Sequence, residues 1–310
     1  MLIIPIAKLA YYKRERIAIL ETIHLGPAAW EPCQPLYFAV MGDTGSGLPA
    51  QQRVADQLVR WHERHAFQFI ALLGDNIYPN GDALKYGEKK FSSLYRPLIN
   101  QEVPFMCLLG NHDISGPLGV GYPTFWMSNQ KEHMRFFKMP APYYDFTCGP
   151  AHFFMLNTNR IKATERLWLS EQLKRSSAPW KIVAGHHPVF SSGFHGSTRR
   201  LKRKLKPILE KHNVPLYLSA HEHDYERFSE INGVTYIVSG GGGADLRWFR
   251  SPLPNSLVRE SQHHFLACEL IGTRLKVTVV NDQGEIIDAW DLSAPHAAAL
   301  ISEEQCRLPV

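Results

Sequence analysis

Paired cysteines are missing from this sequence of 310 residues, which holds five cysteines and no C-x-x-C pair. The five are odd in number and scattered, at positions 33, 107, 148, 268 and 306. We therefore expect neither a disulfide framework nor a zinc–thiolate site. Cys107 lies inside an apolar run and is expected to be a core residue.

Long hydrophobic runs are also missing, because no apolar stretch reaches the ~20 residues that a membrane-spanning helix needs. The apolar segment at residues 1–7 is short, has no basic segment before it and resembles a secretory signal poorly. A cytoplasmic location is the default expectation, and secretion is left open. Oligomeric state has no signature in the sequence.

A strong charge imbalance is absent too. The formal net charge is +5, which suits an anionic substrate but is equally typical of ordinary surface lysines. The basic run in a helix expected at residues 198–212 lacks aromatic side chains that could stack on bases, so we expect no nucleic-acid binding. Without repeats or linkers, we expect one catalytic domain at residues 36–293, an N-terminal extension at 1–35 and a tail at 294–310.

Five apolar runs in the sequence are each followed at once by side chains that can bind metals. Residues 36–41 are followed by Gly42-Asp43-Thr44-Gly45, residues 69–73 by Gly74-Asp75-Asn76-Ile77-Tyr78, and residues 105–109 by Gly110-Asn111-His112-Asp113. Residues 181–184 are followed by Gly185-His186-His187-Pro188, and residues 214–218 by Ser219-Ala220-His221-Glu222-His223. Ligands of open α/β sheets bind outside the carboxyl ends of the strands. The five ends therefore predict one shared polar site.

The pair His221 and His223 is the centre of this pattern. Side chains two residues apart face the same side of a strand, and imidazole is the commonest metal ligand in proteins. Beyond the strand end the alternation relaxes, so the two rings can reach two different ions.

Between the apolar runs we expect helices at 49–65, 86–98 and 165–175, and we expect the end of the domain to form β-strands.

These five blocks, taken in order, resemble those of the calcineurin-like metallophosphoesterases. Within them the chain is most similar to the purple acid phosphatases of the small, tartrate-resistant type, because Thr44-Gly45 follows Asp43 and a tyrosine stands at Tyr78. The resemblance runs from about Tyr37 to Ser239. It implies an α/β fold of two mixed β-sheets packed face to face with flanking helices, and a dinuclear metal site at the carboxyl ends of the strands.

The resemblance also implies which side chains bind which ion. The first metal would take Asp43, Asp75, Tyr78 and His223, and the second Asp75, Asn111, His186 and His221. A phenolate with carboxylates favours iron(III), whereas imidazoles with an amide suit a divalent ion such as zinc, manganese or iron(II). Ala220 stands where relatives usually have glycine.

In such a family a metal-bound hydroxide attacks phosphorus between two ions. We expect His112 and His195 to orient the phosphate, one of them protonating the leaving group, with Asp113 orienting His112. His187 is expected in packing or at the surface, with substrate contact as the alternative. His263 and His264 are expected at the surface. The segment 114–142 is expected to overhang the site and set specificity.

The leading hypothesis is a metal-dependent hydrolase of small phosphate monoesters. A phosphodiesterase or nucleotide hydrolase that uses the same site is the alternative within enzymes. A non-catalytic scaffold on this fold is the alternative from another class.

Overall fold

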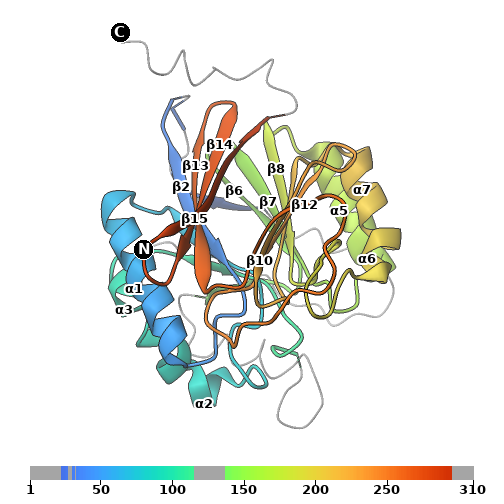
Figure 1. The fold of residues 1–310 in the computed structure, drawn as a ribbon. Coiled ribbons are helices and arrows are strands. Elements are labelled where there is room, and N and C mark those ends of the chain that lie inside the picture. Colours follow the sequence, from blue (N-terminus) through green and yellow to red (C-terminus); the bar gives the residue numbers. More distant parts are fainter. Residues whose placement is uncertain (1–21, 27–29, 32, 115–136, 295–310) are drawn as a thin grey trace, which may run out of the picture.

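Two packed β-sheets with helices on their outer faces form the fold in the computed structural model (Figure 1). The structure describes residues 22–26, 30–31, 33–114 and 137–294. Most of the expected N-terminal extension, most of the 114–142 segment and the tail beyond Ala294 lie outside these ranges.

The seven-stranded sheet is parallel in its middle and antiparallel on one side. Its strands, in spatial order, are β15 (Ile286–Ser293), β14 (Arg274–Asn281), β13 (His264–Ile271), β2 (Leu36–Met41), β3 (Phe69–Leu72), β4 (Phe105–Cys107) and β5 (Phe137–Lys138). Three of the five apolar runs therefore form adjacent parallel strands, β2, β3 and β4.

The eight-stranded sheet has a parallel centre with antiparallel pairs on both sides of it, and its first edge pair, β1 with β6, is parallel. Its strands, in spatial order, are β1 (Ile23–Leu25), β6 (Tyr144–Cys148), β7 (Ala151–Leu156), β8 (Trp180–Gly185), β9 (Leu216–Ser219), β11 (Thr235–Ser239), β10 (Tyr225–Phe228) and β12 (Ser256–Glu260). The other two apolar runs form β8 and β9. β1 lies within the expected N-terminal extension and is the edge strand beside β6.

Aromatic side chains fill the space between the two sheets. Phe69 of the seven-stranded sheet packs edge-to-face on Phe146 and Phe153 of the other, with ring centroids 5.1 and 5.0 Å apart. Phe38 packs on Phe153 in the same way at 5.3 Å. Edge-to-face pairs of this kind contribute about 0.5–1.5 kcal/mol beyond the burial of area. The prediction of two mixed sheets packed face to face is confirmed.

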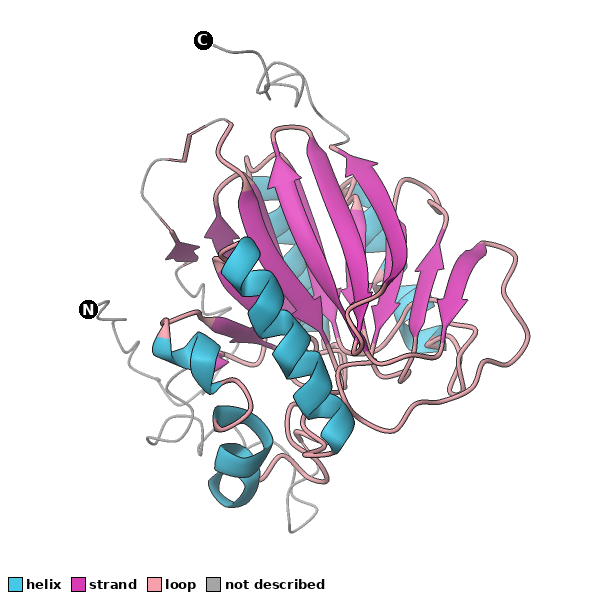
Figure 2. Cartoon of the chain, turned by 60° about the vertical axis from the view of Figure 1, so that its left-hand side comes forward, coloured by secondary structure: helices cyan, strands magenta, loops and turns pink. Residues whose placement is uncertain are grey.

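Helices cover the outer face of each sheet. Helix α1 (Pro49–Arg64) crosses the seven-stranded sheet and buries Val54 and Leu58 against it (Figure 2). On the opposite side α5 (Ala163–Arg175), α6 (Arg199–Lys204) and α7 (Lys206–Lys211) pack on the eight-stranded sheet through a separate apolar cluster.

The expected helices at 86–98 and 198–212 are each divided in the structure. The first is replaced by α2 (Ala83–Gly87), the π-helix η1 (Glu88–Ser92) and α3 (Arg96–Asn100), and the second by α6 and α7. Pro97 and Pro207 stand in the first turns of α3 and α7, where a proline that lacks an N–H is tolerated. Each proline therefore begins a new helix and cannot continue an old one.

The cysteines behave differently from one another. Cys107, which was expected in the core, is a buried free thiol, and so are Cys148 and Cys268. Cys33 is disulfide-bonded, a cross-link that the expectation of no disulfide framework did not include.

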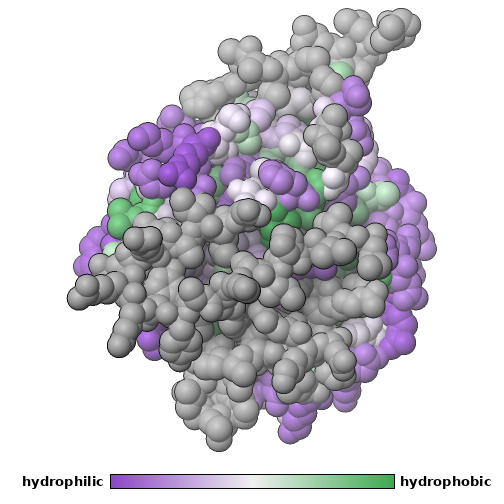
Figure 3. Space-filling model, turned by 180° about the vertical axis from the view of Figure 1, so that it is seen from behind, coloured by the Kyte–Doolittle hydropathy of each residue, from purple (hydrophilic) through white to green (hydrophobic). Residues whose placement is uncertain are grey.

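The described surface seen from behind Figure 1 is largely hydrophilic along its flanks, with smaller hydrophobic areas between them (Figure 3). Among the helices of the described ranges, none is both long enough and apolar enough to cross a bilayer.

Candidate metal centre

The five strand ends meet at one edge of the molecule because backbone hydrogen bonds join them. The N–H of Asp43, after β2, donates to the carbonyl of Gly74, after β3, at 3.0 Å. The N–H of Ala220, after β9, donates to the carbonyl of His186, after β8, at 2.9 Å. The N–H of Gly42 donates across the sheets to Ser239 at 2.9 Å. The predicted single site is thus built from both sheets.

Three of the predicted ligands have left-handed backbone conformations. The φ angles are 56° at Asp43, 52° at Asp75 and 72° at His221. Non-glycine residues rarely adopt this region, at a cost of about 1–3 kcal/mol each, and they concentrate at functional sites. The conformation turns each side chain out of its strand direction and toward the shared edge.

The other three predicted ligands of the first ion converge on the phenolic oxygen of Tyr78. This Oη lies 3.0 Å from Asp43 Oδ1, 3.2 Å from Asp75 Oδ2 and 3.2 Å from His223 Nε2. The Tyr78 hydroxyl therefore points at these three side chains and away from the rim.

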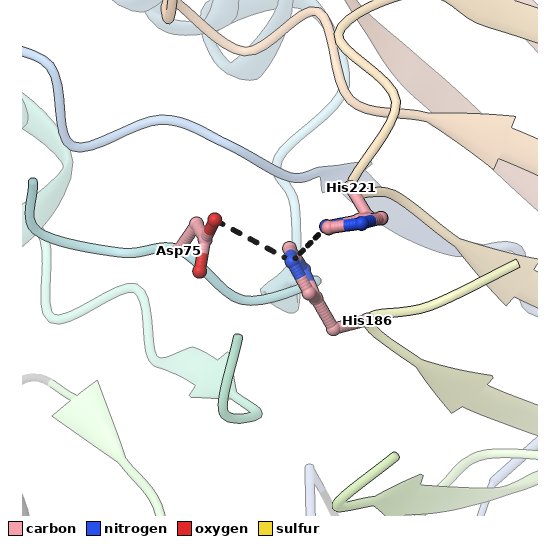
Figure 4. A group of neighbouring side chains, drawn as sticks. All are labelled: Asp75, His186 and His221. Atoms are coloured by element: carbon pink, nitrogen blue, oxygen red, sulfur yellow. Dashed lines mark hydrogen bonds and ion pairs between the residues drawn. The ribbon is translucent and has the colours of Figure 1, made fainter. Parts of the chain in front are cut away.

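The other three predicted ligands of the second ion converge on Nε2 of His186. Asn111 Oδ1 lies 3.1 Å from it, His221 Nδ1 3.2 Å and Asp75 Oδ2 3.5 Å. Figure 4 shows Asp75, His186 and His221 pointing toward one another, and their ligand atoms lie within 4.8 Å of each other. Asp75 Oδ2 belongs to both sets.

Backbone carbonyls fix the histidine tautomers. His186 Nδ1 lies 2.8 Å from the carbonyl oxygen of Leu73, and His223 Nδ1 lies 2.6 Å from that of Asp245. A carbonyl can only accept, so each Nδ1–H must donate to it. Nε2 of both rings is left as a lone-pair donor that faces the site, which is the arrangement usual in metal-binding histidines.

The donor atoms fit a pair of cations in spacing and in charge. With metal–ligand bonds of about 2.0–2.2 Å, two donors on one ion lie about 3.0–3.5 Å apart, which is the spacing found here. Asp43 and Asp75 are 0% and 1% exposed, and their only ion-pair partners in the described ranges are histidines. Buried carboxylates require a compensating cation.

The pKa of each of these side chains depends on its burial and on the charges of its neighbours in the site. Burial opposes the charge of His186, but Asp75 and Asp43 more than offset this and raise its pKa to about 9. Burial, with Asp43 and Asp75 nearby, raises the pKa of the Tyr78 phenol far above its usual range. Burial and the neighbouring His186 lower the pKa of His221. Without a bound cation His186 thus holds a proton that offsets the charge of the two carboxylates, and Tyr78 keeps its phenolic proton, so the binding of metal ions would release both protons.

The two predicted catalytic histidines lie on either side of the ligand sets and are more exposed than most of the ligands. The His112 side chain is 35% exposed, its ring packs on Tyr78 at 4.6 Å, and Nδ1 donates to the Pro79 carbonyl at 2.6 Å. The His195 side chain is 38% exposed and its ring stacks on His221 at 4.4 Å. Burial and the charge of Arg247 lower the pKa of His195.

Asp113 is buried, and the expectation that it orients His112 stays a prediction. Its carboxylate accepts from the backbone N–H and the side-chain amide of Asn76 at 2.9 and 2.8 Å, and from the Gly110 N–H at 2.8 Å. It joins the loops after β3 and β4, and the carbonyl of Pro79 orients the His112 ring.

Two further histidines lie deeper than expected. His264 is 0% exposed and bonds to Ser239 Oγ at 3.0 Å, so the prediction of a surface residue is wrong. His263 is half-buried. His187 lies among the ligands, with its ring 4.6 Å from that of His221 and Nδ1 2.9 Å from Thr158 Oγ1.

Sequence reasoning missed Glu222 and Arg247. Glu222, between the two ligand histidines, is 0% exposed and accepts from the backbone N–H groups of His195 and Gly196, both at 2.7 Å. The alternation of the His-x-His segment could have indicated that its middle carboxylate points inward. Arg247 donates to the His221 carbonyl at 2.9 Å from a loop that carries no motif.

Residues 36–225 match the family described as calcineurin-like phosphoesterase. The chain belongs to this family. It is also 30% identical over 304 residues to purple acid phosphatase 4 of Arabidopsis thaliana, covering 89% of this chain and 88% of that protein. Human tartrate-resistant acid phosphatase type 5 is 26% identical over 308 residues, covering 87% of this chain and 94% of that protein.

Solved structures show the same fold. GAP50, described as the anchor in the inner membrane complex of Plasmodium, superimposes with a TM-score of 0.74 at 22% identity, over 88% of this chain and 93% of that one. At this identity the likeness concerns the fold alone. The resemblance to purple acid phosphatases is confirmed by the sequence relatives, and this phosphoesterase is a phosphoric ester hydrolase of a family that implies a dinuclear metal site.

Proposed function

We propose that this phosphoesterase hydrolyses small phosphate monoesters with two metal ions held by the two donor sets. The observation that carries the proposal is the position of Asp75 Oδ2, 3.2 Å from Tyr78 Oη and 3.5 Å from His186 Nε2. One carboxylate oxygen is thereby shared by both sets, as a bridging ligand requires. Two adjacent cations at such a site activate water and neutralise charge on phosphoryl oxygens.

The two sets favour different ions. Tyr78, Asp43 and Asp75 offer hard oxygen donors, which favour iron(III) in the set completed by His223. His186, His221 and Asn111 offer imidazole and amide donors, which suit zinc, manganese or iron(II). Occupancy of the first set by iron(III) would give a visible phenolate-to-iron absorption band that Tyr78→Phe abolishes.

His112 and His195 are placed to act on the substrate itself. Because His112 Nδ1 donates to Pro79, Nε2 is the ring atom that faces the site, 4.0 Å from Asp75 Oδ2. The Glu222 carboxylate lies 3.3 Å from His195 Nδ1 and holds the second ring against His221. In hydrolysis the oxygen of water joins phosphorus, the bond from phosphorus to the leaving oxygen breaks, and that oxygen takes a proton, which either ring can supply.

The charge around the site favours monoesters over diesters. A monoester carries one more ionisable oxygen than a diester and needs more positive charge around it. Arg247 offers that charge beside the donor sets, since its Nη1 lies 3.1 Å from His195 Nδ1.

The test is an assay of the protein loaded with iron plus zinc or manganese on an aryl phosphate monoester and the matched diester. We expect the monoester to be turned over much faster, and Asn111→Ala to lower the activity by about a hundredfold or more. A preference for the diester would contradict the monoester assignment, and no turnover with two bound metals would favour a non-catalytic scaffold.

A further inference from the structure

The loop between β11 and β12 is fastened to the candidate metal ligands. The backbone N–H of Arg247 donates to the His223 carbonyl at 3.2 Å, and its guanidinium donates to the His221 carbonyl at 2.9 Å. His223 in turn donates from Nδ1 to the carbonyl of Asp245 at 2.6 Å. Side chains on this loop therefore have fixed positions relative to the candidate metal centre.

This loop presents an exposed tryptophan beside an exposed phenylalanine. Trp248 is 61% exposed and Phe194, which lies in the loop after β8, is 38% exposed. Their rings meet edge-to-face, with centroids 5.6 Å apart at 79°. Exposed large apolar side chains in contact with each other indicate a binding surface more often than isolated ones do. We call Phe194 and Trp248 the aromatic rim.

The aromatic rim is connected to the ligands by ring contacts. The ring of Phe194 packs edge-to-face on that of His195 at 5.2 Å, and His195 stacks on the ligand His221 at 4.4 Å. A phosphate ester that places its phosphorus at the donor sets, beside His195, therefore extends its leaving group toward the aromatic rim.

Positive charge accompanies the rim. The Arg250 guanidinium lies 5.4 Å from the centre of the Phe194 ring, and its backbone N–H donates to the Ser192 carbonyl at 2.8 Å. Within the described ranges neither Arg247 nor Arg250 forms an ion pair with a carboxylate. Arginines of this kind can bind an anionic group, and arginine over a ring strengthens a stacking surface.

We infer that Phe194, Trp248 and Arg250 form a leaving-group subsite. It selects phosphate monoesters whose leaving group is a planar aromatic ring, and favours those that carry a second anionic group. The inference rests on the proposed monoesterase function and adds its substrate class. The rings pack on the planar group and Arg250 pairs with the anion.

Two pairs of synthetic esters test the two parts of this subsite separately. Benzyl phosphate and cyclohexylmethyl phosphate both leave as primary alcohols and carry a six-membered ring on the same linkage, so they differ chiefly in whether that ring is planar and aromatic. 4-(Carboxymethyl)phenyl phosphate and phenyl phosphate differ in the anion, which a methylene group insulates from the phenol oxygen. We expect kcat/KM to favour benzyl over cyclohexylmethyl, and the carboxymethyl compound over phenyl, by about threefold to tenfold in each pair.

Variants assign each preference to its side chain. Trp248→Leu is expected to bring the benzyl-to-cyclohexylmethyl ratio to about one, whereas Trp248→Phe, which keeps a ring, retains most of the preference. Arg250→Gln is expected to abolish the preference for the anionic ester only. Arg259→Gln, an exposed arginine on β12, is the matched control and leaves both ratios unchanged.

The outcomes separate the subsite from the proposed function. Equal rates within both pairs in the wild-type protein would overturn the subsite and leave the monoesterase standing. Preferences that persist in Trp248→Leu and Arg250→Gln would also overturn it. Failure of the metal-loaded protein to hydrolyse any of the four esters would overturn both.

Discussion

The two halves of the candidate metal centre differ in the atoms they offer. The half around Tyr78 Oη gathers the oxygens of Asp43 and Asp75 and a single imidazole, His223. The half around His186 Nε2 gathers a second imidazole, His221, and an amide oxygen, and shares Asp75. The difference shows how one cluster of strand ends can hold two unlike ions, because each half is matched to a different chemistry while one carboxylate joins them.

The largest expected effect comes from removing the shared ligand. Asp75→Ala should lose both ions and lower kcat/KM at least about a thousandfold, since neither half keeps its full set of donors. Metal analysis of the purified variant and the phosphatase assay measure this. Asp282→Asn, which alters a carboxylate paired with the surface residue Arg53, should bind two ions as the wild type does. Two ions retained by Asp75→Ala would show that Asp75 is not shared.

Single substitutions in each half should separate the ions. Asn111→Ala should weaken the divalent ion, keep the visible band of the iron set and lower kcat by about a hundredfold or more. Tyr78→Phe should abolish the band and retain the divalent ion. Absorption spectra and metal content, recorded on both variants, check the pattern. Loss of the band in Asn111→Ala would contradict the division into two halves.

Substitution of the histidines outside both halves should spare the metals. His112→Ala and His195→Ala are each expected to lower kcat about a hundredfold through loss of proton transfer or phosphate positioning, with metal content unchanged. The control is His24→Ala, on β1, where the ring bonds to Thr147. Near wild-type turnover in both variants would remove these histidines from the mechanism.

The smallest expected effect concerns the contact between Gly42 and Ala220, which joins the two halves of the candidate metal centre. A Cβ added at Gly42, which precedes Asp43, would lie 2.3 Å from the Cβ of Ala220, which precedes His221. Gly42→Ala should therefore lower the free energy of unfolding by about 1–3 kcal/mol. Combining Gly42→Ala with Ala220→Gly should restore part of the lost stability, because the contact with the Ala220 methyl group is removed. The contact between the new Cβ and the Cβ of Leu73, at 3.1 Å, remains. Denaturant unfolding of both single variants and the double variant measures the coupling.

The sequence allowed one shared polar site to be predicted because a block of metal-binding side chains follows each apolar run, and the family resemblance supplied the division into two donor sets. Because β2, β3 and β4 are parallel, as are β8 and β9, the carboxyl ends of these strands lie side by side. The residues that follow each strand in the sequence are then the residues at the shared edge. The departure at Ala220 has a simple structural reason, since the absent side chain of Gly42 leaves room for its methyl group.

Contacts between distant segments could not be predicted in this way. Phe194 and Trp248 come from different loops without any motif, and their meeting depends on how the loop after β11 folds back over His223. His264 opens a strand but faces Ser239 between the sheets, which its position near a loop did not indicate. Helix boundaries at Pro97 and Pro207 could have been found, because proline is a local signal.

The most direct test of the account is a crystal structure of the metal-loaded protein with anomalous scattering data at the iron and zinc edges. The account predicts two ions about 3.5–4 Å apart, bridged by Asp75, with iron bound to Tyr78 and the divalent ion to Asn111. A single ion, or two ions that do not share Asp75, would contradict it.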